Sequence, residues 1–214
     1  MTACCASAVA LDFDAKREAA IPLAQAAAEI AAGRFVWIDL EAADPAEARQ
    51  ILADLGLVGE EVIEMALREE PSTQYARYDA YVHLVVSGYR QTGDDFIVER
   101  VSVTLGQTFM LTIRPGPVAF MAAVRRDYRN DFVRFAKTPS FLLYEIWDHL
   151  IDSYLEVQSA MGDRVERTRQ DEDREIASDG LQLATADRLD VPQVARDAVE
   201  HEIMRHHSQR VLRS

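Results

Sequence analysis

Four acidic residues follow one another along residues 138–175, a segment that the sequence predicts to be helical. They are Glu145, Asp148, Asp152 and Glu156. Asp148 and Asp152 are four positions apart, so both carboxylates lie on one face of a helix, where like charges repel each other. A divalent cation would relieve that repulsion, but it takes about six oxygen ligands. Water or another subunit would have to complete such a site, and a solvated helix face is the alternative.

Other residue types that carry catalysis do not combine into a site in this sequence. His201 and His206 resemble a zinc-protease helix motif, but that motif needs two histidines four positions apart on one helix face. Their spacing of five turns the two side chains roughly 140° apart. His83 and His149 are isolated in the sequence, which is typical of structural histidines. No phosphate-binding loop, Ser-His-Asp signature or nucleophilic cysteine motif is present, so the sequence makes no case for an enzyme.

The composition of the chain points to a soluble protein that attracts cations. Its 214 residues include 23 basic and 36 acidic side chains, which give a formal net charge of −13. So acidic a surface repels phosphate backbones and anionic lipids, which argues against nucleic-acid binding. Cys4 and Cys5 are adjacent and cannot cross-link distant segments, which favours a reducing compartment. The longest uncharged stretch, residues 101–113, is shorter than the roughly 20 residues of a membrane-spanning helix.

The pattern of apolar residues and helix-end signals predicts an α/β (α+β) fold with a mostly antiparallel mixed sheet flanked by helices. Strands are expected at residues 7–12 and 35–40, followed by an antiparallel meander over 80–113. The segment 35–40 is apolar on both faces, which predicts a central strand. Helices are expected at residues 22–32, 45–55 and 60–69, with one or two more over 117–135. The second of these helices has the clearest signals: Asp44 as the cap, Pro45 at the first position, Glu47 to complete a capping box, and Gly56 as the stop.

The most regular predicted element is a long helix over residues 138–175. One stripe of this helix is apolar, which indicates a packing partner along one side; its members are Ile146, Leu150, Tyr154, Val157, Met161, Val165 and Thr168. So long a helix extends beyond a domain of this size, so that another subunit or another segment has to cover its far end. We therefore expect an α/β domain at residues 1–137, a stalk helix at 138–175 and an irregular tail at 176–214.

Three stretches occur in a characteristic order: Phe35–Leu40 with its following helix, Tyr75–Val86, and Leu142–Tyr154. Together they resemble the N-terminal cytoplasmic part of the CorA family of divalent-cation transporters. The third stretch is the most specific, since the family opens its long helix with a similar pattern of leucine, tyrosine and aspartate. The resemblance covers approximately residues 7–175.

This resemblance implies a function in divalent-cation transport. Family members are pentameric inner-membrane channels for Mg²⁺ or a related ion, with a cytoplasmic α/β domain and a stalk helix that enters the membrane. Cations bound between neighbouring cytoplasmic domains hold the pore shut. The chain would then be the soluble ion-sensing and assembly domain of a Mg²⁺/Co²⁺ transporter, or of a ZntB-like Zn²⁺ transporter, at the cytoplasmic face of a bacterial inner membrane.

The resemblance also implies which residues hold the ion. Asp148 resembles the carboxylate at the base of the family's stalk, Glu64 resembles the acid on the facing helix, and Asp152 lies one turn beyond Asp148. Met65 stands where metal-sensing members place an aspartate, a departure that fits the ZntB-like branch. We therefore expect Mg²⁺, Co²⁺ or Zn²⁺ to bind weakly, because neighbouring stalks would have to complete the site.

The sequence departs from the family after residue 176. There the family continues through further stalk helices, two apolar spans and a Gly-Met-Asn loop, and the tail of this chain resembles none of them. A truncation, a naturally short relative and a frame shift in a longer gene each explain this difference. The partners would be copies of the chain itself. The family forms pentamers, whereas this chain would be a monomer or a dimer. It would contact the membrane only through the spans that this sequence lacks. The alternative function is a free-standing soluble interaction domain without transport.

Overall fold

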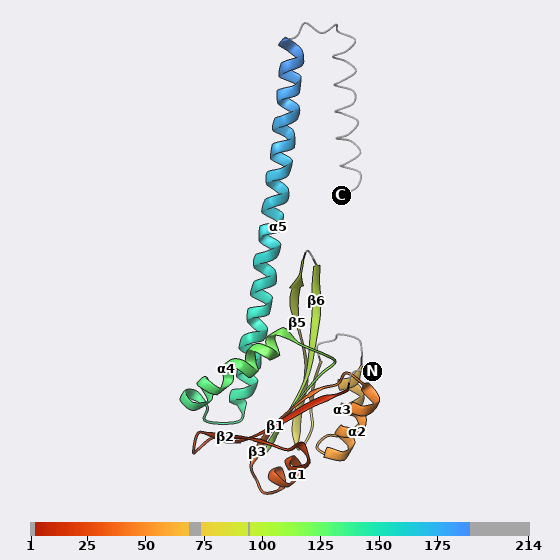
Figure 1. Cartoon of the computed structure of the whole chain (residues 1–214), viewed down its shortest axis with the longest axis vertical. Helices are drawn as coiled ribbons and strands as arrows, with labels where there is room; N and C mark the ends of the chain where they lie inside the picture. The colour runs from red at the N-terminus through yellow and green to blue at the C-terminus, as the bar shows by residue number, and fades with distance from the viewer. Residues whose placement is uncertain (1–2, 69–73, 94, 189–214) are drawn as a thin grey trace. The chain divides into compact units, whose positions relative to one another are not determined.

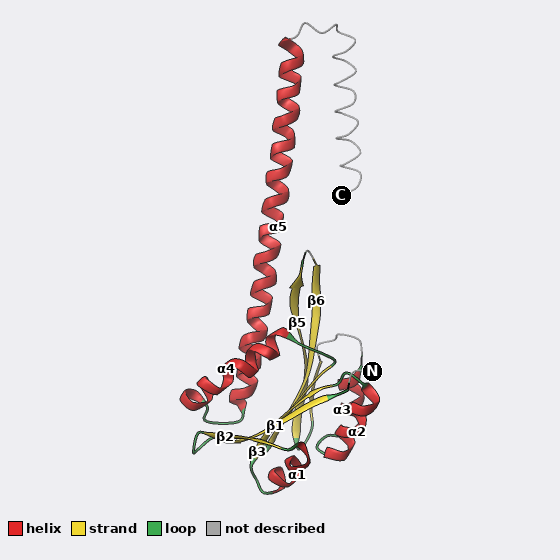
Figure 2. Ribbon diagram, in the orientation of Figure 1, coloured by secondary structure: helices red, strands yellow, loops and turns green. Residues whose placement is uncertain are grey.

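A computed structural model of the chain describes residues 3–68, 74–93 and 95–188, with side chains described as far as residue 176. The chain divides into two units, residues 1–158 and 159–214. The first unit contains the sheet and the helices that pack on it (Figures 1 and 2). The second contains the later part of the longest helix.

The first unit is built on a sheet of seven strands, as Figure 2 shows in yellow. The strands are β1 (Cys5–Asp12), β2 (Arg17–Ile21), β3 (Phe35–Glu41), β4 (Gln74–Arg77), β5 (Tyr81–Thr92), β6 (Asp95–Gly106) and β7 (Phe109–Arg114), in the order β2-β1-β3-β7-β6-β5-β4. Every neighbouring pair is antiparallel except β3 and β7, which are parallel. The predicted mixed, mostly antiparallel sheet is therefore confirmed, including the meander of β5, β6 and β7.

The parallel strands β3 and β7 form the centre of the sheet. All six residues of β7 and the first six of β3 are buried. Strands covered on both faces have near-continuous apolar sequences, and this is the pattern by which the sequence predicts residues 35–40 to be central. These strands position Asp39 and Thr112, which are register partners in the middle of the sheet.

Three helices, α1 (Leu23–Ala31), α2 (Pro45–Leu55) and α3 (Glu60–Leu67), cover one face of the sheet. The α2 helix begins as predicted, because the Asp44 side chain accepts hydrogen bonds from the backbone N–H groups of Ala46 and Glu47. The reciprocal half of the predicted capping box does not form. Glu47 instead accepts a hydrogen bond from the backbone of Cys4, at 2.9 Å, and so ties the start of the chain to α2.

The opposite face of the sheet is covered by α4 (Ala119–Phe135) and the first turns of α5 (Ser140–Arg188). Helix α4 is one helix, where the sequence left one or two open. Both helices come close to β5 at Gly88: a Cβ added there would lie 2.8 Å from the Phe120 ring and 3.0 Å from Leu150. A glycine at this position therefore allows α4 and α5 to pack against the same strand.

Two strands were not predicted, and both lie at the edges of the sheet. β2 is Ala-rich and partly exposed, and β4 has four residues that alternate between half-buried and exposed. Short, polar edge strands lack the apolar runs by which strands are recognised, and such edges also discourage unwanted pairing between molecules. Tyr75 lies in β4. The unpredicted strand therefore overlaps Tyr75–Val86, one of the stretches that resemble the family.

Helix α5 differs from its prediction in length. It continues through Ser178 and Gly180 to Arg188, where the sequence was expected to become irregular from residue 176. A single glycine lowers helix stability by only about 1 kcal/mol and does not by itself end a helix. The remainder of the expected tail, including His201 and His206, lies outside the described residues.

The predicted apolar stripe of α5 is buried only at its beginning. Ile146 and Leu150 are in the core, whereas Tyr154 is 42% exposed and Val165 is 70% exposed. Every side chain from Met161 to Ile176 is exposed. None of the helices within the described ranges is both long enough and apolar enough to cross a membrane.

Candidate functional site

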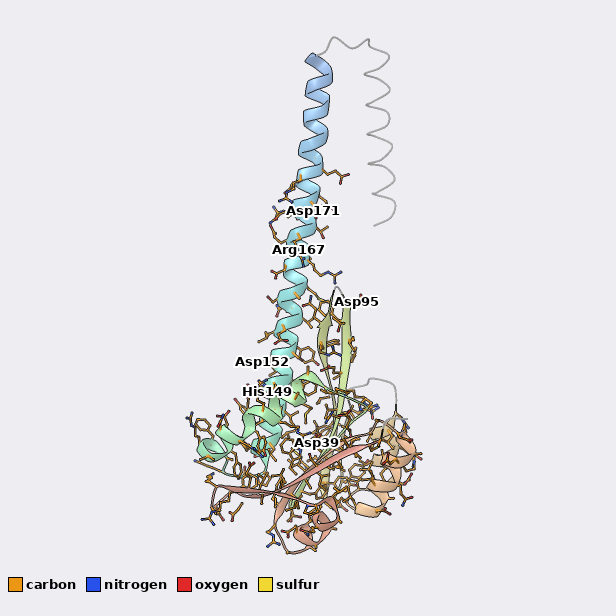
Figure 3. The ribbon with its side chains drawn as sticks, in the orientation of Figure 1. Asp39, Asp95, His149, Asp152, Arg167 and Asp171 are labelled. Carbon is orange, nitrogen blue, oxygen red and sulfur yellow. The ribbon has the colours of Figure 1, made fainter. Side chains whose placement is uncertain are left out.

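The three carboxylates predicted to bind a cation lie on two different layers. Glu64 is exposed on α3, and Asp148 and Asp152 are exposed on α5; Figure 3 labels Asp152. Because α3 and α5 cover opposite faces of the sheet, one chain does not bring Glu64 to the two aspartates. Among the described residues, no three His, Cys, Asp or Glu side chains already lie in an arrangement that could hold a metal ion.

Asp152 has a fixed position because the residues after it are bonded to β5. The backbone N–H of Tyr89 donates a hydrogen bond to Ser153 Oγ at 3.4 Å, and the Tyr154 hydroxyl donates to the Ser87 carbonyl. The rings of Tyr89 and Tyr154 also pack edge to face, with centroids 5.4 Å apart. These contacts hold one side of α5 on the sheet and leave Asp152 on the exposed side.

Glu64 lies in a less favourable setting for a cation. It lines a groove of about 550 Å³ between α2 and α3, together with Arg49 and Arg68. The Arg68 guanidinium in this groove opposes the approach of a cation, whereas the charge of Arg49 is paired with Glu60. Met65, next in the chain, supplies no carboxylate, and its backbone carbonyl accepts a hydrogen bond from the buried Arg100.

Arg100 belongs to a polar cluster between β5, β6 and α3. Its guanidinium donates to the carbonyls of Met65 and Arg68, which satisfies carbonyl groups at the C-terminal end of α3. Nearby, His83 is fully buried, with its Nδ1 2.9 Å from the Thr104 hydroxyl. Burial, and to a smaller extent the charge of Arg100, lowers the pKa of His83 to about 4. His83 is therefore a neutral structural residue at physiological pH.

A second buried network surrounds Asp39 in the centre of the sheet, which Figure 3 labels. The Thr112 hydroxyl donates to Asp39 Oδ1 at 2.8 Å. Arg114 and Arg125 donate to Asp39 Oδ2 at 3.2 and 2.9 Å, and Arg114 also pairs with Glu41 at 2.6 Å. The network joins β3, β7 and α4, and its charges are paired within it, so it is structural. No sequence pattern predicts this network, because its members are far apart along the chain.

Glu145 corrects one expectation about α5. The sequence placed it with the charged, solvated residues of the helix, but its side chain is buried and the residue is only 6% exposed. It occupies the edge of the buried stripe that contains Leu142, Ile146 and Leu150. Burial first, and then the charges of Asp131, Asp148 and Asp127, raise the pKa of Glu145 to about 7.

The acids that surround Glu145 come from both α4 and α5. Asp127 and Asp131 are on α4, whereas Asp148 is one turn beyond Glu145 on α5. His149 lies beside Asp127, with 3.8 Å between Nε2 and the nearer carboxylate oxygen. Sequence reasoning missed this cluster because the contribution of α4 becomes visible only when the two helices are packed together.

Comparison with known families gives a match over most of the chain. The sequence profile of the family described as CorA-like Mg²⁺ transporter protein matches residues 32–188. No curated protein sequence matches the chain.

Solved structures with the same fold include two structures of one CorA protein and one structure of a ZntB domain. The soluble domain of CorA from Methanocaldococcus jannaschii superposes with a TM-score of 0.61 at 15% identity, over 81% of this chain and 65% of that one. The complete CorA magnesium transporter of the same organism gives 0.61 at 16% identity, over 83% and 53%. The ZntB cytoplasmic domain from Vibrio parahaemolyticus RIMD 2210633 gives 0.56 at 14% identity, over 75% and 63%. The chain thus spans less than two thirds of each of these structures.

Proposed function

The chain belongs to the CorA-like Mg²⁺ transporter family, and we propose that it acts as the cytoplasmic ion-sensing and assembly domain of a divalent-cation transporter. The observation that carries this proposal is the family match over residues 32–188, which includes both helices that expose the predicted carboxylates. This is a family of transporters and not of enzymes. Transport itself is proposed only for an assembly that also contains membrane spans.

The arrangement of the carboxylates supports a site between two copies of the chain. Glu64 on α3 and Asp148 on α5 lie on opposite layers of one copy, so an ion can bridge them only where α3 of one copy approaches α5 of another. An ion that binds the assembled form in preference to the free form stabilises assembly by RT ln(1 + [L]/Kd). Loss of the ion then favours separation of the copies, which is the linkage that a sensor requires.

The chemistry of these residues favours a weakly bound, hard cation. Carboxylate oxygens suit Mg²⁺, which keeps several of its water ligands and is held by one or two carboxylates. Arg68 beside Glu64, and Met65 in place of a further acid, both reduce the affinity. We therefore propose Mg²⁺ as the ion, with Co²⁺ and Zn²⁺ as competitors for the same carboxylates.

The test compares assembly and heat of binding in wild type and Asp148→Ala. Sedimentation velocity and titration calorimetry are run with MgCl₂, CoCl₂ or ZnCl₂, and with EDTA as the metal-free reference. Glu156→Gln is the matched control, since it removes one exposed negative charge from the same helix. We expect Mg²⁺ to shift the wild type and the control towards larger species, and not Asp148→Ala. Identical heats and sedimentation for wild type and Asp148→Ala would contradict the proposal.

A further inference from the structure

A pocket of about 530 Å³ lies beside the N-terminal end of α4. Three arginines line it, and each comes from a different element: Arg90 from β5, Arg114 from the end of β7 and Arg125 from α4. Among the described residues that line the pocket, Glu99 alone is acidic. The wall therefore carries an excess of positive charge, in a chain whose net charge is −13, and it favours an anion.

The Asp39 network holds Arg114 in place without using all of its donors. Arg114 donates through Nη1 to Glu41 and to the Gly116 carbonyl, and through Nη2 to Asp39. Its Nε is buried and has no hydrogen-bond partner within the described part of the chain, and the side chain is only 9% exposed. A buried donor without a partner is costly, so it indicates a place that a ligand or an ordered water completes.

Arg125 and Arg90 also have donors to spare at the pocket. A guanidinium has five N–H donors. Arg125 donates to Asp39 through Nη1, and Arg90 donates to Glu99 and Thr92 through Nε and Nη1. Both side chains are nearly half exposed, so they reach the solvent at the pocket mouth. Guanidinium groups in this position can bind the oxygens of a phosphate or a carboxylate in pairs.

The first turn of α4 adds backbone donors to the same pocket. Val118 and Ala119, at the start of the helix, line the pocket. Val118 is the N-cap and has no side-chain acceptor, and the first turn contains no acidic residue. Glu99 accepts one hydrogen bond there, from the backbone N–H of Ala119 at 2.6 Å. The positive end of a 17-residue helix therefore remains available to a further negative group.

We propose that this pocket binds the phosphate group of a small, soluble phosphomonoester. Arginine forks together with a helix N-terminus are a donor set that suits phosphate oxygens. Pro117, Val118 and Ala122 give the wall an apolar part, against which the organic portion of the ligand would lie. The volume is that of a small-molecule site. The acidic surface of the chain opposes an anionic membrane, which argues against a lipid headgroup as the source of the phosphate.

The experiment titrates the full chain with phenyl phosphate by calorimetry, with inorganic phosphate and phenol as comparisons. EDTA is present throughout, so that the proposed cation site contributes nothing. We expect one phenyl phosphate to bind each chain, more tightly than inorganic phosphate, and phenol to give no binding heat. Because the attraction is electrostatic, added NaCl should weaken the binding of phenyl phosphate.

Two matched pairs of variants locate the binding. Arg125→Gln should weaken binding of phenyl phosphate at least about tenfold, because hydrogen bonds to charged groups are among the strong ones. Arg126→Gln removes the next charge along α4, outside the pocket, and should bind like wild type. Ala122→Glu places a carboxylate in the pocket, three positions before Arg125, and should also weaken binding about tenfold. Ala122→Gln has the same size without the charge and should bind more tightly than Ala122→Glu.

Three outcomes would overturn the inference. Phenol could bind as well as phenyl phosphate, or Ala122→Glu and Ala122→Gln could bind phenyl phosphate equally. The chain could also bind vesicles that contain phosphatidic acid and no soluble phosphate, which would assign the phosphate to a lipid. Circular dichroism establishes that each variant is folded. If Arg125→Gln does not fold, the two Ala122 variants decide the result, because Ala122 is exposed on α4.

Discussion

Asp39 and Glu145 are buried to nearly the same degree, with exposures of 3% and 6%, but their surroundings are opposite in charge. Asp39 receives hydrogen bonds from Thr112, Arg114 and Arg125. Glu145 is surrounded by acids, among which Asp131 has the largest effect. One carboxylate is fully compensated by the fold, and the other is not.

This difference decides which form of each carboxyl group the fold favours. Moving a carboxylate out of water carries a large desolvation cost in either place. At Asp39 the two arginines offset that cost and join β3, β7 and α4. At Glu145 the cost is not offset, so the pKa rises to about 7 and the position favours the protonated carboxyl. A buried carboxyl therefore stays ionised only where the fold supplies the compensating charge.

The largest expected effect on stability comes from removing Asp39, the carboxylate that the arginines compensate. Asp39→Ala leaves Arg114 buried with only Glu41 as an acidic partner, and breaking a buried pair costs about 3–5 kcal/mol. We expect the free energy of unfolding to fall by about this amount in urea denaturation, with an unchanged slope. Asp39→Asn retains an oxygen that can accept the Thr112 bond and should lose less. Equal stability of wild type and Asp39→Ala would show that the network is not structural.

Removal of the Glu145 charge, which lacks a compensating partner, should increase the free energy of unfolding at high pH. The folded state raises the pKa of Glu145 from 4.5 to about 7, so folding favours its protonated form. Below pH 4.5 the group is protonated in both states and no penalty exists. As the pH rises from 4.5 to 7 the unfolded chain ionises first, and the penalty grows to about 3 kcal/mol above pH 7. Glu145→Gln should therefore match wild type at pH 4 and be more stable at pH 8.

The measurement is denaturant unfolding of both proteins at several pH values, in EDTA so that no metal contributes. The difference between the two proteins is the relevant quantity, because other groups titrate equally in both. Asp152→Asn is the control, since it removes an exposed acid from the same helix and should show no such pH dependence. A constant difference between pH 4 and pH 8 would mean that Glu145 is not held in the protonated form by its surroundings.

The sequence was informative about the fold wherever one chain segment contains its own signal. Asp44, Pro45 and Gly56 marked the ends of α2, and the continuous apolar run of β3 marked a central strand. The edge strands β2 and β4 were missed because partly exposed residues there lack a core-facing pattern. The end of α5 was misplaced because Gly180 weakens a helix without ending it.

The site was harder to predict because charge compensation is a property of packed elements. Asp148 and Asp152 could be placed on one helix face from their spacing alone, and the structure exposes both. The burial of Glu145 depends on how far the packed edge of α5 extends, and its neighbours Asp127 and Asp131 come from another helix. One signal was available: Glu145 directly precedes Ile146 in the buried stripe.

A smaller effect is expected at Arg125, which tests how much each arginine contributes to Asp39. The Arg125 side chain is 43% exposed, whereas that of Arg114 is 9% exposed. Water can replace much of the Arg125 interaction, so Arg125→Ala should lower the free energy of unfolding by only about 1 kcal/mol. Arg114→Ala, measured in parallel, should cost several times more. Equal losses would indicate that Asp39 depends on both arginines alike, despite their different burial.

The smallest effect on stability is expected at Arg126, where the comparison can be made sharper without disturbing the core. Its hydrogen bonds to Asp127 lower the pKa of that carboxyl, but both groups lie at the surface. Surface ion pairs contribute little to stability, so Arg126→Gln should leave the thermal midpoint unchanged. The same substitution removes the hydrogen-bond partner of Asp127, so the pKa of that carboxyl should rise towards its ordinary value in an NMR titration. Arg134→Gln, which removes another exposed charge nearer the end of α4, is the control, and equal pKa values of Asp127 in the two variants would show that Arg126 does not hold this carboxyl in its ionised form.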